Sequence, residues 1–212
     1  RVEILEDKDW EREWMKHYAP MQFGERLWVC PSWLEPPEPN AVNLVLDPGL
    51  AFGTGTHPTT ALCLAELDGM DLRGATAVDY GCGSGILAVA ALKLGARQVL
   101  GVDNDPQALD ASRDNAARNT LPANVLPLAL PGDVDSNAWR GTADLVIANI
   151  LAGPLMDLSP TLLDFLRPGG TLLLSGLLES QAAQLCEHYG ERLDIRVAGT
   201  REGWVCLRGT LG

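Results

Sequence analysis

The chain has 212 residues, 46% of them hydrophobic and 6% aromatic, which fits one substantial globular domain with a short extension and excludes two full-sized domains. No apolar run approaches the ~18 residues that span a bilayer, and residues 1–10 lack the pattern of a secretory signal, so we expect no membrane contact and a cytoplasmic location. The net charge of -12 repels phosphate backbones, which disfavours direct nucleic-acid binding and favours a cationic partner, although acidity also serves solubility.

The five cysteines are an odd set without a Cys-x-x-Cys pair, which argues against a disulfide framework and against a zinc cluster. We therefore expect a reduced protein that holds no metal. Cys82 lies inside a glycine-rich turn but has no histidine near it in the sequence. We interpret it as a small filler residue rather than as a nucleophile.

The N-terminal part of the chain predicts an extension of the main domain. Three rings share one face of a helix predicted over residues 7–17. The two strands predicted next are Leu27–Cys30 and Val42–Leu46. The prolines between these strands forbid a helix and mark a connector. We predict a linker helix and a small extension over residues 1–45, and the main domain over residues 46–212.

Beyond this extension, short apolar runs alternate with helical segments, as in a parallel, doubly wound sheet. The predicted strands are Thr76–Tyr80, Gln98–Val102, Val125–Leu130, Leu145–Ala148 and Thr171–Ser175. The predicted helices are Ile86–Leu94, Pro106–Asn119, Gly153–Phe165 and Ser180–Tyr189, and the helical pattern is weakest over Ala129–Thr142. Two last strands, Leu193–Val197 and Trp204–Leu207, flank a turn over Ala198–Gly203. The sequence therefore predicts an α/β fold whose mostly parallel sheet ends on an antiparallel strand.

A glycine-rich turn is the most informative segment of the chain. Alternate glycines at positions 81, 83 and 85 follow a strand and precede an apolar helix. Positions without a side chain let the backbone approach a nucleotide, and the helix N-terminus offers free N–H groups. Asp103 ends the next strand, 22 positions after Gly81, where a carboxylate can accept both hydroxyls of a ribose. We predict that Gly81, Gly83 and Asp103 bind a nucleotide cofactor.

Asp79, just before the turn, distinguishes between two nucleotide cofactors. Gly83, Gly85 and Ala88 also fit a relaxed dinucleotide fingerprint, so a nicotinamide-dependent oxidoreductase is an alternative. The charge of Asp79 would oppose a pyrophosphate, whereas it would favour the ammonium and sulfonium groups of S-adenosylmethionine. The antiparallel terminal strands also suit a methyltransferase sheet. A structural alternative remains, in which Asp79 merely caps the glycine turn.

A second loop, over residues 47–60, combines turn residues with hydroxyl groups and leads into an apolar helix whose first turn contains Pro58. It is no Walker phosphate loop, because no lysine follows its glycines. One interpretation is that the loop folds over the cofactor and that Thr60 presents a hydroxyl to it. The other is a helix cap followed by a connector.

Asn149 directly follows the strand predicted over Leu145–Ala148. Ligands of open α/β sheets bind at the carboxyl ends of the strands, so we expect Asn149 beside Gly81 and Asp103. Its side-chain amide could accept an N–H bond from a substrate amine and orient it. By itself, an asparagine at a strand end is more often a turn residue.

These motifs resemble the bacterial ribosomal protein L11 methyltransferases, the PrmA-like family of protein N-methyltransferases. The resemblance covers nearly the whole chain and rests on Asp7-Lys8-Asp9-Trp10, Phe23-Gly24, Leu27-Trp28, Asp47 to Thr60, Asp79 to Gly85 and Ala148 to Ala152. It implies a Rossmann-like, seven-stranded class I methyltransferase sheet with S-adenosylmethionine as the cofactor. The cofactor contacts that it implies are Thr60, Gly81, Asp103 and Asn149.

The resemblance also implies a substrate, namely lysine side-chain and N-terminal amino groups of that ribosomal protein. The family carries an N-terminal domain that grips the ribosomal protein, and we expect this domain to be missing from the sequence in hand. We expect direct attack of a neutral amine on the methyl carbon, with Asn149 orienting the amine and no required general base. A catalytically silent nucleotide-binding module is the second alternative.

Overall fold

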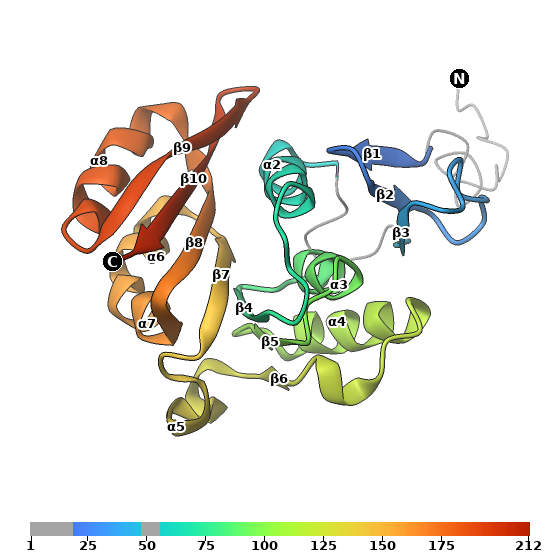
Figure 1. Cartoon of the computed structure of the whole chain (residues 1–212), viewed down its shortest axis with the longest axis horizontal. Helices are drawn as coiled ribbons and strands as arrows, with labels where there is room; N and C mark the ends of the chain where they lie inside the picture. The colour runs from blue at the N-terminus through green and yellow to red at the C-terminus, as the bar shows by residue number, and fades with distance from the viewer. Residues whose placement is uncertain (1–18, 48–55) are drawn as a thin grey trace, which may run out of the picture.

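The computed structural model describes residues 19–47 and 56–212. The helix expected over residues 7–17 and most of the loop over residues 47–60 lie outside the described residues. The described chain forms a three-layer α/β structure around a seven-stranded sheet of order β6-β5-β4-β7-β8-β10-β9 (Figure 1). Its strands are β4 (Thr76–Tyr80), β5 (Gln98–Val102), β6 (Leu128–Ala129), β7 (Ala143–Asn149), β8 (Leu166–Leu178), β9 (Leu193–Arg201) and β10 (Trp204–Leu211).

The strand directions confirm the predicted fold class. Pairs β4–β5, β5–β6, β4–β7 and β7–β8 are parallel, whereas β10 runs antiparallel to both β8 and β9. Parallel strands need crossover connections, and helices supply most of them here. The helices are α2 (Pro58–Asp68), α3 (Ile86–Lys93), α4 (Pro106–Arg118), α5 (Ser136–Trp139), α6 (Ala152–Asp157), α7 (Ser159–Phe165) and α8 (Glu179–Gly190).

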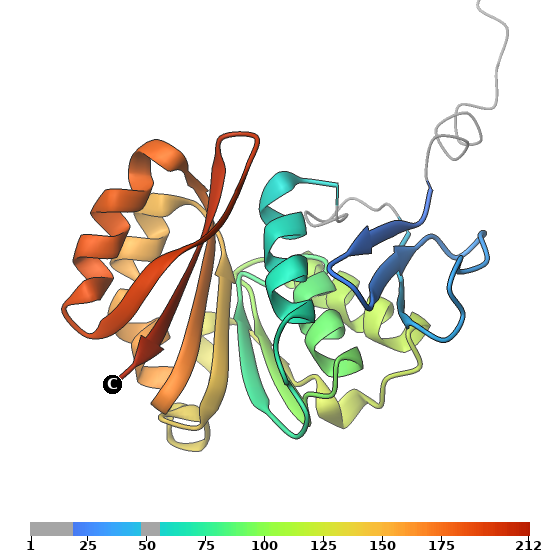
Figure 2. The same ribbon diagram turned by 45° about the horizontal axis from the view of Figure 1, so that its top comes forward.

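Helices cover both faces of the sheet. Figure 2 shows α2, α3 and α4 on one side and α6, α7 and α8 on the other. Successive residues of a strand point to opposite faces. Accordingly, Leu145 and Ile147 of β7 pack into the core under α2 and α3, whereas Val146 packs into the core under α7 and α8. The apolar runs of the sequence are thus buried on both faces, as parallel sheets require.

A small three-stranded sheet precedes α2. It consists of β1 (Met21–Phe23), β2 (Leu27–Cys30) and β3 (Val42–Val45), with β1–β2 antiparallel and β2–β3 parallel. Its buried side chains, among them Leu27 and Leu44, share one core with α2 and α3. The sequence predicted β2 and β3 but missed β1. The boundary between residues 45 and 46 stays a prediction.

Several element bounds differ from the predicted ones. Strand β6 is shorter than the predicted Val125–Leu130, because Val125 ends a 3-10 turn and Pro127 cannot donate to a neighbouring strand. The helix predicted over Gly153–Phe165 is divided into α6 and α7. Pro160, near the start of α7, lacks the N–H that one continuous helix would need. Of the segment Ala129–Thr142, only Ser136–Trp139 is α-helical.

The terminal hairpin is longer and tighter than predicted. Strands β9 and β10 pair up to Arg201 and Trp204, so the turn predicted over Ala198–Gly203 contains only two residues. These residues, Glu202 and Gly203, both have positive φ, 53° and 79°. Two-residue hairpin turns favour this backbone because its twist matches that of the strands. The tight turn places Trp204 at the start of β10.

Candidate active site

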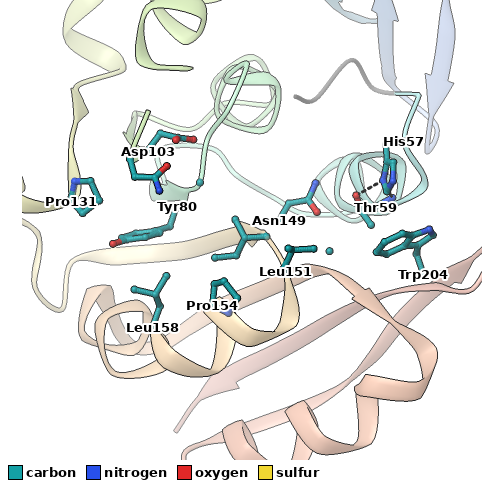
Figure 3. A pocket seen from close by; sticks show the side chains of 14 residues that line it. His57, Thr59, Tyr80, Asp103, Pro131, Asn149, Leu151, Pro154, Leu158 and Trp204 are labelled. Carbon is teal, nitrogen blue, oxygen red and sulfur yellow. Dashed lines mark hydrogen bonds between the residues drawn. The ribbon is translucent and has the colours of Figure 1, made fainter. Parts of the chain in front are cut away.

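A cavity of about 670 Å³ lies at the carboxyl ends of β4, β5 and β7. This is the edge at which open α/β sheets bind ligands. Asp103, Tyr80 and Pro131 lie toward one end of it, and His57, Thr59 and Trp204 form the other end (Figure 3). Asn149 and Leu151 lie between the two ends. Of the predicted site residues, Gly81, Asp103 and Asn149 line the cavity.

The glycine turn has the geometry that ligand approach requires. Gly81 has a φ of 82°, a conformation that side chains disfavour, and a Cβ there would collide with Ile150. Its N–H and that of Cys82 donate to the Val102 carbonyl at 2.7 and 3.0 Å, which ties the turn to β5. Helix α3 begins directly after the turn, at Ile86. The turn therefore offers a bare, fixed backbone to the cavity.

Asp103 is held by the backbone on both of its carboxylate oxygens. Oδ2 accepts from the N–H of Gly83 at 2.9 Å, and Oδ1 accepts from the N–H of Asp105 at 3.0 Å. Each oxygen retains further capacity to accept, because a carboxylate has about four acceptor sites. The carboxylate is thus oriented toward the cavity and still able to accept two ligand hydroxyls. Gly83 itself does not line the cavity among the described residues; it orients Asp103.

Asp79 lies behind the turn instead of in the cavity wall. It is 1% exposed, and its Oδ2 accepts from the Ala88 N–H in the first turn of α3 at 3.0 Å. Its Oδ1 has no hydrogen-bond partner among the described residues. Burial raises the pKa of this carboxyl to about 7. The hydrogen bond made in the structure joins Asp79 to α3, not to the glycine turn itself, and the predicted contact with a cofactor stays a prediction.

Thr60 lies beneath Asn149. It is fully buried in the first turn of α2, and its Oγ1 accepts from Asn149 Nδ2 at 3.3 Å. Asn149 Oδ1 is buried and has no hydrogen-bond partner among the described residues. Asn149 thus lines the cavity with its amide nitrogen fixed by Thr60, while its acceptor oxygen lies buried and unpartnered. The predicted contact of Thr60 with a cofactor stays a prediction.

Sequence reasoning missed the residues at the far end of the cavity. His57 caps the N-terminus of α2, and its Nδ1 lies 2.8 Å from Thr59 Oγ1. The rings of His57 and Trp204 meet edge-on, with centroids 5.0 Å apart. The His-Pro start of α2 is a visible cap signal, but the sequence shows no sign that β10 would bring Trp204 against it. This end of the cavity is therefore a tertiary feature.

Cys82 behaves as the predicted filler. It is 5% exposed, and the Ser112 hydroxyl donates to its Sγ at 3.5 Å. Burial raises the pKa of the thiol to about 12, so the nucleophilic thiolate is strongly disfavoured. All five cysteines carry free thiols. Within residues 19–47 and 56–212, no cluster of side chains has the composition of a metal site, and no helix is long and apolar enough to cross a membrane.

Comparison with known proteins identifies the family. The model of the family described as "Ribosomal protein L11 methyltransferase (PrmA)" matches residues 1–211. The proteins named ribosomal protein L11 methyltransferase from Tolumonas auensis and Photobacterium profundum are 60% and 58% identical over 209 residues, which is 99% of this chain and 70% of each relative.

Solved structures agree with these relatives. A ribosomal protein L11 methylase from Lactobacillus delbrueckii subsp. bulgaricus superimposes with a TM-score of 0.80 at 34% identity, covering 92% of this chain and 99% of that one. An RNA methyltransferase from Salinibacter ruber in complex with S-adenosyl-L-homocysteine shares the fold, with a TM-score of 0.55 at 20% identity over 73% of this chain and 92% of that one. The chain belongs to the ribosomal protein L11 methyltransferase family.

Proposed function

We propose that this chain transfers methyl groups from S-adenosylmethionine to lysine side-chain and N-terminal amino groups of ribosomal protein L11. The observation that carries the proposal is the buried, unpartnered Oδ1 of Asn149, a residue that lines the cavity. A buried acceptor without a donor is costly, by about 1–3 kcal/mol. An N–H of a bound amine would relieve that cost.

The described residues fit the methyl donor. Asp103 has free acceptor capacity on both oxygens for ribose hydroxyls, and Gly81 leaves bare backbone where a side chain would fill the space. Thr60 positions Asn149 and Gly83 positions Asp103, each through one hydrogen bond. When ionised, Asp79 would favour a cationic ligand. When bound, S-adenosylmethionine supplies an electrophilic methyl group on a sulfonium.

The chain's own residues would prepare the amine. A lysine has an unperturbed pKa near ~10.4, and only its neutral form has the lone pair that attacks. The cavity wall is largely apolar, with Ile150, Leu151 and Pro154 among its residues, and desolvation there would favour the neutral amine. Asn149 Oδ1 would accept one N–H and direct the lone pair, so that alignment supplies most of the acceleration. Water would take the proton.

The charge of the chain supports a basic partner. A net charge of -12 attracts a cationic protein and repels nucleic acid, so the proposed partner is the ribosomal protein and not ribosomal RNA. A protein that modifies a ribosomal component would act in the cytoplasm, where ribosomes are made. The nicotinamide alternative finds no support in the three ribosomal protein L11 methyltransferases described above, which are named for methyl transfer.

The test is transfer of a labelled methyl group from S-adenosylmethionine to purified ribosomal protein L11. We expect Asn149→Ala to lower kcat by at least about ten-fold while S-adenosylhomocysteine still binds, because the lost hydrogen bond orients the amine. Asp103→Asn should instead weaken S-adenosylhomocysteine binding by about ten-fold or more, measured by calorimetry.

Asn137→Ala is the matched control, since Asn137 is exposed on α5 and does not line the cavity. It should leave both quantities unchanged. Methyl label on RNA but not on L11, or full activity of Asn149→Ala, would contradict the proposal.

A further inference from the structure

Trp204 forms part of the end wall of the cavity, remote from Asp103 (Figure 3). It is the first residue of β10, and its backbone is fixed by pairing with Arg201 on β9 and Leu178 on β8. Its ring meets His57 edge-on, with centroids 5.0 Å apart and planes at 67°. Backbone pairing and ring contact together hold the indole at the end of the cavity that lies beyond Asn149, away from Asp103.

Charge is distributed unevenly along the cavity. Among the described lining residues the only carboxylate is Asp103, and it lies at the opposite end from Trp204. An amine that enters between Asn149 and Trp204 becomes a cation as soon as its nitrogen bonds to a methyl carbon. No described lining residue offers it a counter-charge there. The aromatic ring of Trp204 is the group that can attract a cation at this end.

Successive methylation changes what the wall must recognise. Asn149 can accept a hydrogen bond only while the nitrogen keeps an N–H, and each added methyl group removes one. The attraction between an indole ring and an ammonium group does not need an N–H and suits a methylated ammonium, as in aromatic cages. Recognition should therefore pass from Asn149 to Trp204 as methyl groups accumulate.

We infer that the indole of Trp204 binds the methylated ammonium group, which makes Trp204 a residue that determines how well multiply methylated amines are held. The inference rests on the proposed function for the identity of the ligand class. It predicts that the chain binds a multiply methylated amine more tightly than an unmethylated one, a preference that a binding measurement without methyl transfer can show. Retention of the methylated amine by this wall would let the same nitrogen lose its next proton to water and react again.

Two acetylated lysine amides test this preference, one unmodified and one trimethylated on Nε, each titrated calorimetrically into the chain saturated with S-adenosylhomocysteine. We expect the wild-type chain to bind the trimethylated probe about five- to thirty-fold more tightly. Trp204→Leu, which keeps an apolar side chain but no ring, should abolish the preference. Trp204→Phe should retain part of it, because phenylalanine still has an aromatic ring.

Controls separate cation recognition from packing. Trp139→Leu removes an indole from α5, outside the cavity lining, and should keep the wild-type preference. An uncharged tert-butyl isostere of the trimethylated side chain should bind wild type more weakly than the cation does, a comparison that requires no variant. Equal binding of cation and isostere, or an undiminished preference in Trp204→Leu, would overturn the inference. Because no methyl is transferred, these results are independent of the L11 methylation assay.

Discussion

Asp79 is a buried carboxylate whose ionisation is coupled to folding. Its hydrogen bond from the Ala88 N–H stabilises the charged form, but burial opposes that form more strongly, and the pKa is raised to about 7. In the unfolded chain the carboxyl would titrate near ~3.9. Between these two values the folded chain binds more protons than the unfolded one. Stability should therefore fall as pH rises through this window.

The first prediction compares the wild type with Asp79→Asn, which keeps an acceptor for the Ala88 N–H but cannot ionise. Below about pH 4 the carboxyl is neutral in both states, so the wild type carries no penalty there. Between pH 4 and pH 8 the free energy of unfolding of the wild type should fall by a few kcal/mol relative to the variant, at about 1.4 kcal/mol per pKa unit. Urea unfolding at each pH measures this difference.

Asp110→Asn is the control for this titration. Asp110 is exposed on α4 and pairs with Arg113 at the surface, so its replacement should leave the pH dependence of the wild type intact. If the free energies of unfolding of the wild type and Asp79→Asn differed by the same amount at every pH between 4 and 8, the coupling of Asp79 ionisation to folding would be contradicted.

At the scale of residues, the sequence identified one end and the middle of the cavity but not the other end. Gly81 and Asp103 each follow a parallel strand and Asn149 ends one, and the carboxyl ends of such strands meet at one edge. Locating the ends of these strands in the sequence is therefore enough to predict that the three residues lie close together. His57 and Trp204 meet only because α2 packs against the terminal hairpin, and no local pattern encodes that contact.

At the scale of elements, a buried carboxylate adds a polar connection to the apolar core that the small sheet shares with α2. Asp68, the last residue of α2, is 4% exposed and accepts from the backbone N–H groups of Glu25 and Arg26 at 2.7 and 3.2 Å. The Arg26 guanidinium also lies 3.4 Å from Asp68 Oδ1. Gly24, with a φ of 68°, lets the β1–β2 turn wrap around this carboxylate without a clash. The turn and the helix end thus form one polar unit.

Replacement of this carboxylate is the second prediction. Asp68→Ala should lower the free energy of unfolding by about 3 kcal/mol, because two backbone donors and a guanidinium lose a charged, buried acceptor. Asp71→Ala serves as the matched control, since Asp71 is 64% exposed and pairs with Arg73 in solvent. It should change stability far less. Urea unfolding measures both variants. If Asp68→Ala and Asp71→Ala lost equal free energy of unfolding, the buried contacts of Asp68 would not explain the loss of stability.

The prediction of helices and strands succeeded where the spacing of apolar residues and the flanking turn residues agree. Gln98–Val102 and Thr76–Tyr80 were predicted with the bounds that the structure shows, because each is a buried apolar run between turn residues. The helix predicted over Gly153–Phe165 was divided in two because the apolar spacing continues through Pro160 while the hydrogen-bond ladder does not. The hairpin turn was overestimated because Gly199 resembles a turn residue yet pairs with Cys206 inside the sheet.

At the scale of the whole molecule, the cavity joins the two halves of the sheet. Asp103 follows β5 in one half, Asn149 ends β7 in the middle, and Trp204 begins β10 in the other half. The two apolar cores lie on opposite faces of the same sheet and share its strands. A ligand that contacts all three residues would therefore restrain both halves of the sheet at once. Binding should oppose unfolding of the molecule as a unit.

The last prediction concerns the cofactor product alone, which stabilises the folded chain by mass action. S-adenosylhomocysteine at about 100 times its Kd should stabilise the folded chain by about 2.7 kcal/mol, because it binds the folded state and not the unfolded one. For a domain of this size, such a gain corresponds to a rise in Tm of about 5–10 °C in a calorimetric scan. At pH 8, where Asp79 is mostly ionised, NAD at the same concentration should produce no rise, since the negative charge behind the glycine turn opposes a pyrophosphate. A shift with NAD and none with S-adenosylhomocysteine would exclude methyl-donor binding and restore the oxidoreductase alternative.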